Sequence, residues 1–245
     1  MEPPAPSRRV QRIRHELRRR DVEVVRVEAI GPHFAAATFG GGSLADFVSA
    51  SFDDHVKFMF PAPDGEVVRR DYTPRRFDAA ACELTIEFAL HGDGPAARWA
   101  RTARVGQRAV VAGPRGSMII PMDYDWQLLA GDAAALPAIH RRVEELPPGA
   151  RAIVVAQVDE ADRRELRSAA NLDLRWVASA EELLAAIHAL ALPAGEGHAW
   201  AAGEAGTMAQ LRRVLIEDRH HPKESMRVAA YWKRGAAEYH EAMDR

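Results

Sequence analysis

Cysteine is almost absent from this chain: of its 245 residues, only Cys82 carries a thiol. One cysteine cannot form an internal disulfide, and it cannot supply the thiolates that hold an iron–sulfur cluster. We interpret Cys82 as a small residue in the core or at a strand edge. The histidines are scattered, and the adjacent His220 and His221 point apart, so no resident metal site is predicted. The Gly-x-Ser-x-Gly signature of serine hydrolases is also missing.

Long apolar runs are lacking as well. No segment approaches the roughly 20 apolar residues of a membrane helix, and the N-terminus has no apolar region typical of a signal peptide. The 33 basic and 35 acidic residues give a formal net charge of −2, which favours neither nucleic acid nor membrane as a partner. We expect a globular protein of the reducing cytoplasm, and its oligomeric state stays open.

The first twenty residues form a basic arm, which we treat as an N-terminal extension (residues 1–20). Its arginines are opposed only by Glu2 and Glu16. Val10, Ile13 and Leu17 follow helical spacing, which predicts one or two amphipathic turns. A basic arm can bind nucleic acid or an anionic surface. Because no aromatic residue is interleaved and the rest of the chain is not basic, we favour a solvated or packed extension.

Residues 21–122 are expected to form an antiparallel β-barrel. Short segments alternate apolar with polar residues, and glycine or proline separates them. One helix is expected from about 95 to 103. Several short antiparallel strands around one apolar interior are typical of a small barrel. The expected strands include residues 22–27, 55–60, 84–88, 107–112 and 118–120.

Residues 123–245 are expected to form a parallel α/β domain of the nicotinamide-binding type. Strands are predicted at 126–130, 152–156, 173–177, 198–202 and 226–232, and helices at 136–146, 180–190 and 208–218, with Ser179 as a cap. This alternation gives a parallel sheet with helices on both faces, and ligands bind beyond the carboxyl ends of its strands. Gly131-Asp132 and Gly203-Glu204 each follow an expected strand. Glu204 has two interpretations, a cofactor contact or an acid that stabilises a helix start.

A residue after the second strand of this domain bears on the electron donor. Asp159 can accept a hydrogen bond from a ribose hydroxyl, but Arg163, Arg164 and Arg167 lie close behind and can attract a 2′-phosphate instead. NADH and NADPH therefore both stay open.

The most informative stretch is Arg69–Arg75, which contains Arg-x-Tyr-Thr-x-Arg at a strand end. Arg70 and Tyr72 share one face of an extended chain, and Pro74 then turns it. A tyrosine ring can cover an isoalloxazine face, and the hydroxyl of Thr73 can hydrogen-bond a ring nitrogen. The planar fork of Arg75 can grip a pyrophosphate. The alternative is a strand end with solvated arginines.

A second segment, Glu87–Ala100, runs from a strand through a Gly-Pro turn into a short helix. Gly94 lets backbone N–H groups approach an anion, Pro95 suits the first helical turn, and a helix N-terminus attracts phosphate. Trp99 is expected on the inner face of that helix. The alternative is a loop that only starts a helix.

Together these two motifs resemble the siderophore-interacting protein family of ferric-siderophore reductases, within the ferredoxin-reductase-like flavoprotein superfamily. The resemblance runs in family order from about Arg26 to Gly235. It also rests on His55–Pro61, Gly113–Ser117, Leu129–Ile139, Ala201–Glu204 and Tyr231–Gly235. Two positions depart from the family: Ala133-Ala134 replaces the usual Glu-Thr after Gly-Asp, and Ala97 replaces the usual Ser after Gly-Pro-Ala.

The resemblance implies an FAD-dependent reductase of Fe(III) siderophores that takes electrons from NADH or NADPH. Because Ala133-Ala134 offers no hydroxyl to a nicotinamide, reduced ferredoxin is kept as another donor. Trp232 is expected mainly in the core, although the resemblance places it near the flavin ring. The implied cofactor-binding residues are Arg70, Tyr72, Thr73, Arg75, Leu90, His91, Gly94, Pro95, Ala96, Ala97, Trp99, Gly131, Asp132, Glu204 and Trp232.

Lysine is scarce: Lys57, Lys223 and Lys233 are the only three. Ferric siderophores often carry negative charge, so a reductase pocket needs cations near the flavin. The resemblance places Lys57, Lys233 and, as a weaker candidate, Arg115 near the siderophore; the alternative is solvated strand-edge cations. No protein side chain is expected to be catalytic, because the chemistry belongs to the flavin, and iron comes and goes as substrate. Two other functions stay open: a flavin-dependent NAD(P)H oxidoreductase with another acceptor, and a non-catalytic siderophore-binding protein.

Overall fold

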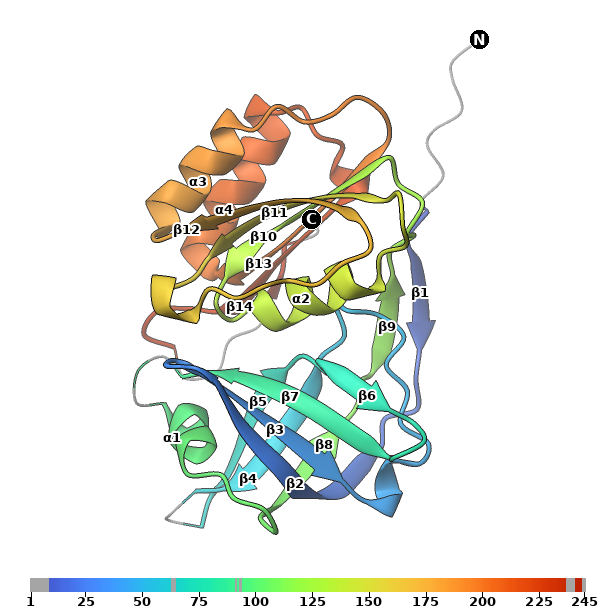
Figure 1. Ribbon diagram of the computed structural model, residues 1–245, viewed down its shortest axis with the longest axis vertical. Coiled ribbons are helices and arrows are strands. Elements are labelled where there is room, and N and C mark those ends of the chain that lie inside the picture. The colour runs from blue at the N-terminus through green and yellow to red at the C-terminus, as the bar shows by residue number, and fades with distance from the viewer. Residues whose placement is uncertain (1–8, 63–64, 91, 93, 237–240, 244–245) are drawn as a thin grey trace.

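The computed structural model describes residues 9–62, 65–90, 92, 94–236 and 241–243. Figure 1 shows two layers stacked along the longest axis, an N-terminal β domain below a C-terminal α/β domain. His91, one of the expected cofactor-binding residues, lies outside the described residues.

The N-terminal domain is a seven-stranded antiparallel sheet around one apolar core, which confirms the predicted β domain. Its strand order is β5-β4-β8-β2-β3-β7-β6. Trp99 of the helix α1 (Pro95–Arg101) packs inside this core, as expected, against Phe58 and Phe88. The strands are β2 (Arg19–Gly31), β3 (Phe34–Gly40), β4 (Val56–Pro61), β5 (Val67–Tyr72), β6 (Arg76–Asp78), β7 (Glu83–Ala89) and β8 (Arg108–Ala112).

The described part of the basic arm, residues 9–20, is not helical, so the prediction of amphipathic turns around Val10, Ile13 and Leu17 is wrong. Residues Gln11–Arg14 form strand β1, which pairs antiparallel with β9 (Gly116–Ile119). The apolar residues of the expected helical face gain little burial, since Ile13 and Leu17 are 44% and 54% exposed. Strand β9 instead offers unpaired backbone groups that the arm satisfies. Arg9 pairs with Asp123 and Glu196, so the described part of the arm is a packed extension.

The C-terminal domain is a sheet of five parallel strands with one short antiparallel strand at its edge, in the order β12-β11-β10-β13-β14-β15. The parallel sheet confirms the predicted α/β class. Its strands are β10 (Trp126–Asp132), β11 (Arg151–Gln157), β12 (Asn171–Val177), β13 (Gly197–Glu204), β14 (Met226–Trp232) and the unexpected β15 (Glu241–Ala242).

Helices cover both faces of this sheet. Helix α2 (Leu136–Glu145) packs on the face toward the β domain, and α3 (Ala180–Ala189) and α4 (Ala205–Arg213) pack on the other (Figure 1). Ser179 caps α3 as predicted by accepting from Glu182 N–H. Helix α4 begins three residues before the predicted start and passes into a π-helical turn, Val214–Asp218. Among the described residues, no helix has both the length and the apolar character needed to cross a bilayer.

Candidate functional site

The carboxyl edge of the parallel sheet brings Asp132, Glu204 and Trp232 together. Asp132 is 8% exposed. One of its carboxylate oxygens, Oδ2, accepts hydrogen bonds from Glu204 N–H at 2.9 Å and from Trp232 Nε1 at 2.8 Å, and Oδ1 accepts from Ala134 N–H. A Cβ built on Gly131 would lie 2.3 Å from the Ala202 carbonyl oxygen, so this position requires glycine. The expected meeting of strand ends at one edge is present.

Glu204 and Trp232 at this sheet edge have the two structural settings that bear on their expected roles. The Glu204 carboxylate accepts from Thr207 N–H at 3.0 Å and caps α4. Partial burial acts to raise the pKa of Glu204, but hydrogen bonds from backbone N–H groups outweigh it and lower that pKa. Trp232 is 41% exposed, so the prediction that it packs in the core is wrong. Strand β14 ends at Trp232, and its alternation sends the preceding Tyr231 inward against Trp200.

The end of β5 places the flavin-type motif at the boundary between the domains. The Tyr72 ring packs 4.5 Å from Phe88 and 6.0 Å from Phe58, measured between ring centroids. Burial of its phenol raises the pKa of Tyr72. Thr73 is 6% exposed, and its side chain hydrogen-bonds Tyr231 of the C-terminal domain. A guanidinium nitrogen of Arg70 donates a hydrogen bond to the Arg69 carbonyl oxygen at 2.6 Å.

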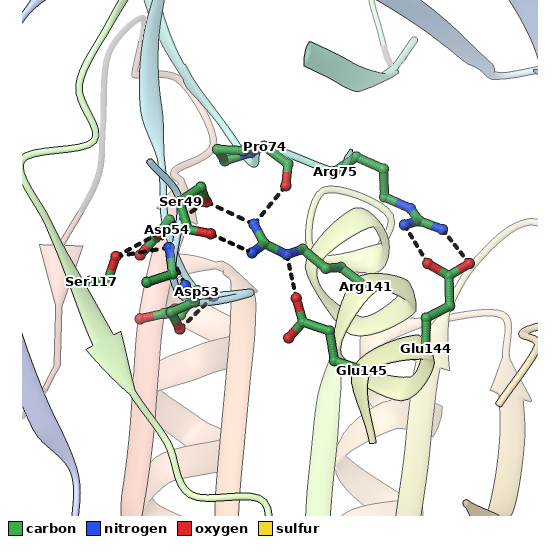
Figure 2. A network of polar contacts seen from close by, with 11 residues as sticks. Ser49, Asp53, Asp54, Pro74, Arg75, Ser117, Arg141, Glu144 and Glu145 are labelled. Atoms are coloured by element: carbon green, nitrogen blue, oxygen red, sulfur yellow. Dashed lines mark hydrogen bonds and ion pairs between the residues drawn. The ribbon is translucent and has the colours of Figure 1, made fainter. Parts of the chain in front are cut away.

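Arg75 bridges the domains instead of presenting an open fork. Its two terminal nitrogens donate to Glu144 of α2 at 2.7 and 2.9 Å (Figure 2). Its Nε lies 3.1 Å from a Glu87 oxygen. Burial, followed by the charge of Arg75, lowers the pKa of the neighbouring His140 to about 4. An anion reaches this fork only by replacing Glu144.

The Gly-Pro segment forms the expected turn and helix. Gly94 precedes α1 without a side-chain cap, and Pro95 takes the first helical position. A Cβ built on Gly92 or Gly94 would meet no atom within 4 Å, so the backbone there is open to a bulky group. Ala96 and Ala97 are buried, while Leu90 is half-buried and donates its N–H to His33. The open backbone at Gly94, the hydroxyl of Thr73 and the guanidinium groups of Arg70 and Arg75 together form a set of hydrogen-bond donors that fits FAD.

The three candidate substrate-binding cations all lie at the surface. Lys57 donates to Asp71, its partner across strands β4 and β5, at 2.8 Å. Lys233 is exposed directly after β14, and Arg115 is exposed just before β9. Lys57 and Arg115 therefore belong to the β domain and Lys233 to the α/β domain.

Asp159 and Arg164, two of the residues expected to distinguish NADH from NADPH, contact different parts of the molecule. Asp159 caps a 3₁₀ turn (Glu160–Asp162) by accepting from Ala161 N–H. Arg164 pairs with Glu87 and lies 5.2 Å from the Phe34 ring centroid, toward the β domain. Atoms of His33, Asp159 and Asp162 lie within 4.8 Å of one another, but His33 already bonds both Asp162 oxygens.

Sequence reasoning missed a buried polar network between the domains. Figure 2 shows Arg141 of α2 reaching to Ser49 and Pro74 of the β domain, where it donates to the Ser49 hydroxyl and the Pro74 carbonyl at 2.8 Å each. Asp53 accepts from Trp200 Nε1 and Arg227 Nε, both at 2.8 Å. The only signal in the sequence is the acidic pair Asp53-Asp54 after Phe52, in a stretch without periodicity.

An antiparallel β domain followed by a parallel α/β domain is also the fold of the ferredoxin reductase in carbazole 1,9a-dioxygenase, which superposes with a TM-score of 0.64 at 17% identity, over 86% of this chain and 68% of that one. Residues 23–69 and 62–118 match the siderophore-interacting FAD-binding domain, and residues 124–235 match the siderophore-interacting protein model. The chain belongs to the siderophore-interacting protein family.

Individual relatives match nearly the whole chain. It is 35% identical to the NADPH-dependent ferric-chelate reductase of Escherichia coli K12, over 91% of this chain and 96% of the relative. It is 29% identical to the ferric vibriobactin reductase ViuB of Vibrio cholerae, over 90% and 92% of the two chains. The crystal structure of a siderophore utilization protein from T. fusca superposes with a TM-score of 0.88 at 36% identity, covering 93% of this chain and 97% of that one.

Proposed function

We propose that this chain is an FAD-dependent ferric-siderophore reductase, which reduces Fe(III) in a siderophore to Fe(II) and so releases the iron. The observation that carries the proposal is its family membership, since both halves of the chain match siderophore-interacting models and relatives of nearly equal length carry ferric-reductase names. Fe(II) binds the hard oxygens of a siderophore more weakly than Fe(III), so reduction frees the metal. The reaction belongs in the cytoplasm, where the nicotinamide donors are found and thiols stay reduced.

The two domains divide the work. Residues 21–122 hold the FAD, residues 123–245 receive the electron donor, and residues 1–20 form an extension. Bound in this domain, FAD would supply the chemistry that takes up a hydride and delivers single electrons to Fe(III). Tyr72 and Thr73 would contact the flavin ring, while Arg70 and the backbone at Gly94 would bind the phosphates. Arg75 joins them when a phosphate displaces Glu144. The wider set (Leu90, His91, Pro95, Ala96, Ala97 and Trp99) shapes the wall behind these contacts.

Gly131, Asp132, Glu204 and Trp232 form the donor side of the site. The Asp132 carboxylate fixes the exposed Trp232 indole at the sheet edge, where an aromatic face can stack on a nicotinamide. The E. coli relative is named for NADPH. NADPH is therefore the first donor to test, with NADH and reduced ferredoxin as comparisons.

Lys57, Lys233 and Arg115 attract the anionic siderophore complex. Asp71 neutralises part of the Lys57 charge, which reduces the share of the attraction that Lys57 supplies.

The test is an anaerobic assay with purified, FAD-loaded protein, NADPH, a ferric siderophore and a ferrous chelator as reporter. We expect two chelated Fe(II) for each NADPH consumed, because a hydride carries two electrons. NADPH oxidation without Fe(II) would indicate an oxidoreductase with another acceptor. Siderophore binding without either reaction would indicate a carrier.

A further inference from the structure

A histidine of the β domain meets two aspartates of the α/β domain where the two domains touch. His33 lies in the turn between β2 and β3, whereas Asp159 precedes and Asp162 ends the 3₁₀ turn that follows β11. One nitrogen or oxygen atom from each of the three side chains lies within 4.8 Å of the other two. His33 and Asp162 are 129 positions apart in the chain, so only the folded protein brings these atoms together.

Local structure holds both aspartates in place. Asp159 Oδ1 accepts from Ala161 N–H at 3.0 Å, which fixes the carboxylate at the start of the turn and leaves its other oxygen available to a ligand. A Cβ built on Gly31 would lie 2.4 Å from Asp162 Oδ1. The Asp162 carboxylate therefore reaches the end of β2 only because residue 31 is glycine.

The Asp162 carboxylate is buried without a permanent positive charge beside it. Its side chain is 1% exposed, and His33 supplies its hydrogen bonds, from the backbone N–H at 2.9 Å to Oδ1 and from Nδ1 at 2.7 Å to Oδ2. Among the described residues, no lysine or arginine forms an ion pair with Asp162. A buried carboxylate is costly unless it is paired or coordinates a metal, and histidine carries charge only when protonated. A bound cation would balance this buried charge.

The spacing suits a small divalent cation. Two ligand atoms about 2.1 Å from a metal, in neighbouring octahedral positions, lie about 3 Å apart. His33 Nδ1 and Asp162 Oδ2, now 2.7 Å apart, need to separate by only about 0.3 Å once the metal replaces the proton between them. Asp159 is exposed, so its side chain can rotate to close the remaining distance, and water can fill the open positions.

The donor set indicates which cations fit. One imidazole nitrogen and carboxylate oxygens, with no thiolate, suit the first-row divalent ions Mn²⁺, Fe²⁺, Co²⁺, Ni²⁺ and Zn²⁺. Soft Cu(I) prefers sulfur ligands, and Ca²⁺ and Mg²⁺ prefer sites made of oxygen alone.

We propose that His33, Asp159 and Asp162 bind one first-row divalent cation, which joins the β domain to the α/β domain. The site needs neither bound FAD nor reductase activity. Unfolding separates the ligands, so the cation stabilises the folded protein in proportion to its binding. A simple hydrogen bond between the domains would explain the His33–Asp162 contact. It would not explain a second carboxylate beside a buried one that lacks a positive partner.

The test uses tag-free protein stripped with a chelator and returned to chelator-free buffer. Calorimetry measures Zn²⁺ binding, and electron paramagnetic resonance measures the loss of free Mn²⁺. We expect one cation per chain, with Zn²⁺ bound more tightly than Mn²⁺. His33→Gln and Asp159→Asn should each weaken binding at least tenfold, the lower end of what the loss of an outer partner of a ligand costs. Asparagine keeps an oxygen for Ala161 N–H, so the turn is preserved.

His188→Gln is the matched control, because His188 lies 3.7 Å from Asp218 in an exposed pair and should not contribute to binding. Thermal unfolding separates a metal site from a structural contact. Zn²⁺ should raise the midpoint of the wild type but not of Asp159→Asn, while the metal-free midpoints should nearly agree. Absence of stoichiometric binding, wild-type affinity in His33→Gln and Asp159→Asn, or equal weakening in His188→Gln would overturn the site. Each of these results would leave the proposed reductase function standing, since no measurement uses FAD or a siderophore.

Discussion

Asp53 provides the sharpest test of how the two domains are held together. Its carboxylate belongs to the β domain and accepts from Arg227 Nε and Trp200 Nε1 of the α/β domain, both at 2.8 Å. The side chains of Asp53 and Arg227 are only 4% and 10% exposed. Replacing one member of a buried ion pair leaves the other charge poorly compensated, which costs about 3–5 kcal/mol. We expect Asp53→Ala to lose that much stability.

The assay is urea unfolding followed by tryptophan fluorescence, with Asp173→Ala as the control. Asp173 pairs with Arg175 at 3.1 Å on the surface, where the side chains are 52% and 44% exposed. An exposed pair contributes less than about 1 kcal/mol. The double change Asp53→Leu/Arg227→Met removes both buried charges and should recover most of the loss. Asp53→Ala with a loss no larger than that of Asp173→Ala would refute the reasoning.

Three further predictions follow from the same contacts. Glu144→Gln removes the negative charge that competes for the Arg75 fork and should tighten FAD binding, whereas Arg75→Ala should weaken it. Equilibrium titration with FAD measures both, and affinities equal to that of the wild type would exclude Arg75 from the site. The double change Lys57→Glu/Lys233→Glu should raise KM for an anionic ferric siderophore roughly fivefold or more at low salt, since each partly exposed charge pair contributes about 1 kcal/mol. KM for a neutral siderophore should change little. An unchanged KM for the anionic siderophore would show that both lysines are solvated strand-edge cations. Burial lowers the pKa of His198 to about 3 and of His140 to about 4, so both stay neutral in the folded state while the unfolded chain takes up protons below about pH 6.5. The free energy of unfolding should therefore keep its full value above that pH and fall by up to about 1.4 kcal/mol per pH unit for each histidine as the pH drops toward 4. Urea midpoints measured against pH should fall less steeply for His198→Gln than for the wild type.

Much of the α/β domain could be predicted from local sequence. The central strands are continuous apolar runs buried on both faces, and Ser179 gives a helix start that the structure confirms. Helix α4 was placed too late because its cap is Glu204, a longer side chain that reaches Thr207 N–H and that the sequence equally allowed as a cofactor contact. Strand β1 was missed because its hydrogen-bond partner lies about a hundred residues away, at β9.

The parts of the site within one motif were easier to predict than those that join the domains. Tyr72 and Thr73 are adjacent in one motif, and Gly94 lies beside Pro95 in the other, so alternation and turn chemistry describe each locally. Glu144, which occupies the Arg75 fork, lies on a helix of the other domain, and no periodicity connects the two residues. The Asp53–Arg227 pair also joins residues far apart in sequence, since it forms only where the loop before β4 meets β14, the last parallel strand.

The central claim, reduction of a ferric siderophore by bound flavin, is tested most directly without any nicotinamide. FAD-loaded protein is photoreduced anaerobically and mixed with a ferric siderophore in the presence of a ferrous chelator. The account predicts that the oxidised flavin spectrum returns and that two chelated Fe(II) appear for each flavin. A flavin that stays reduced in excess ferric siderophore, with no chelated Fe(II), would contradict it.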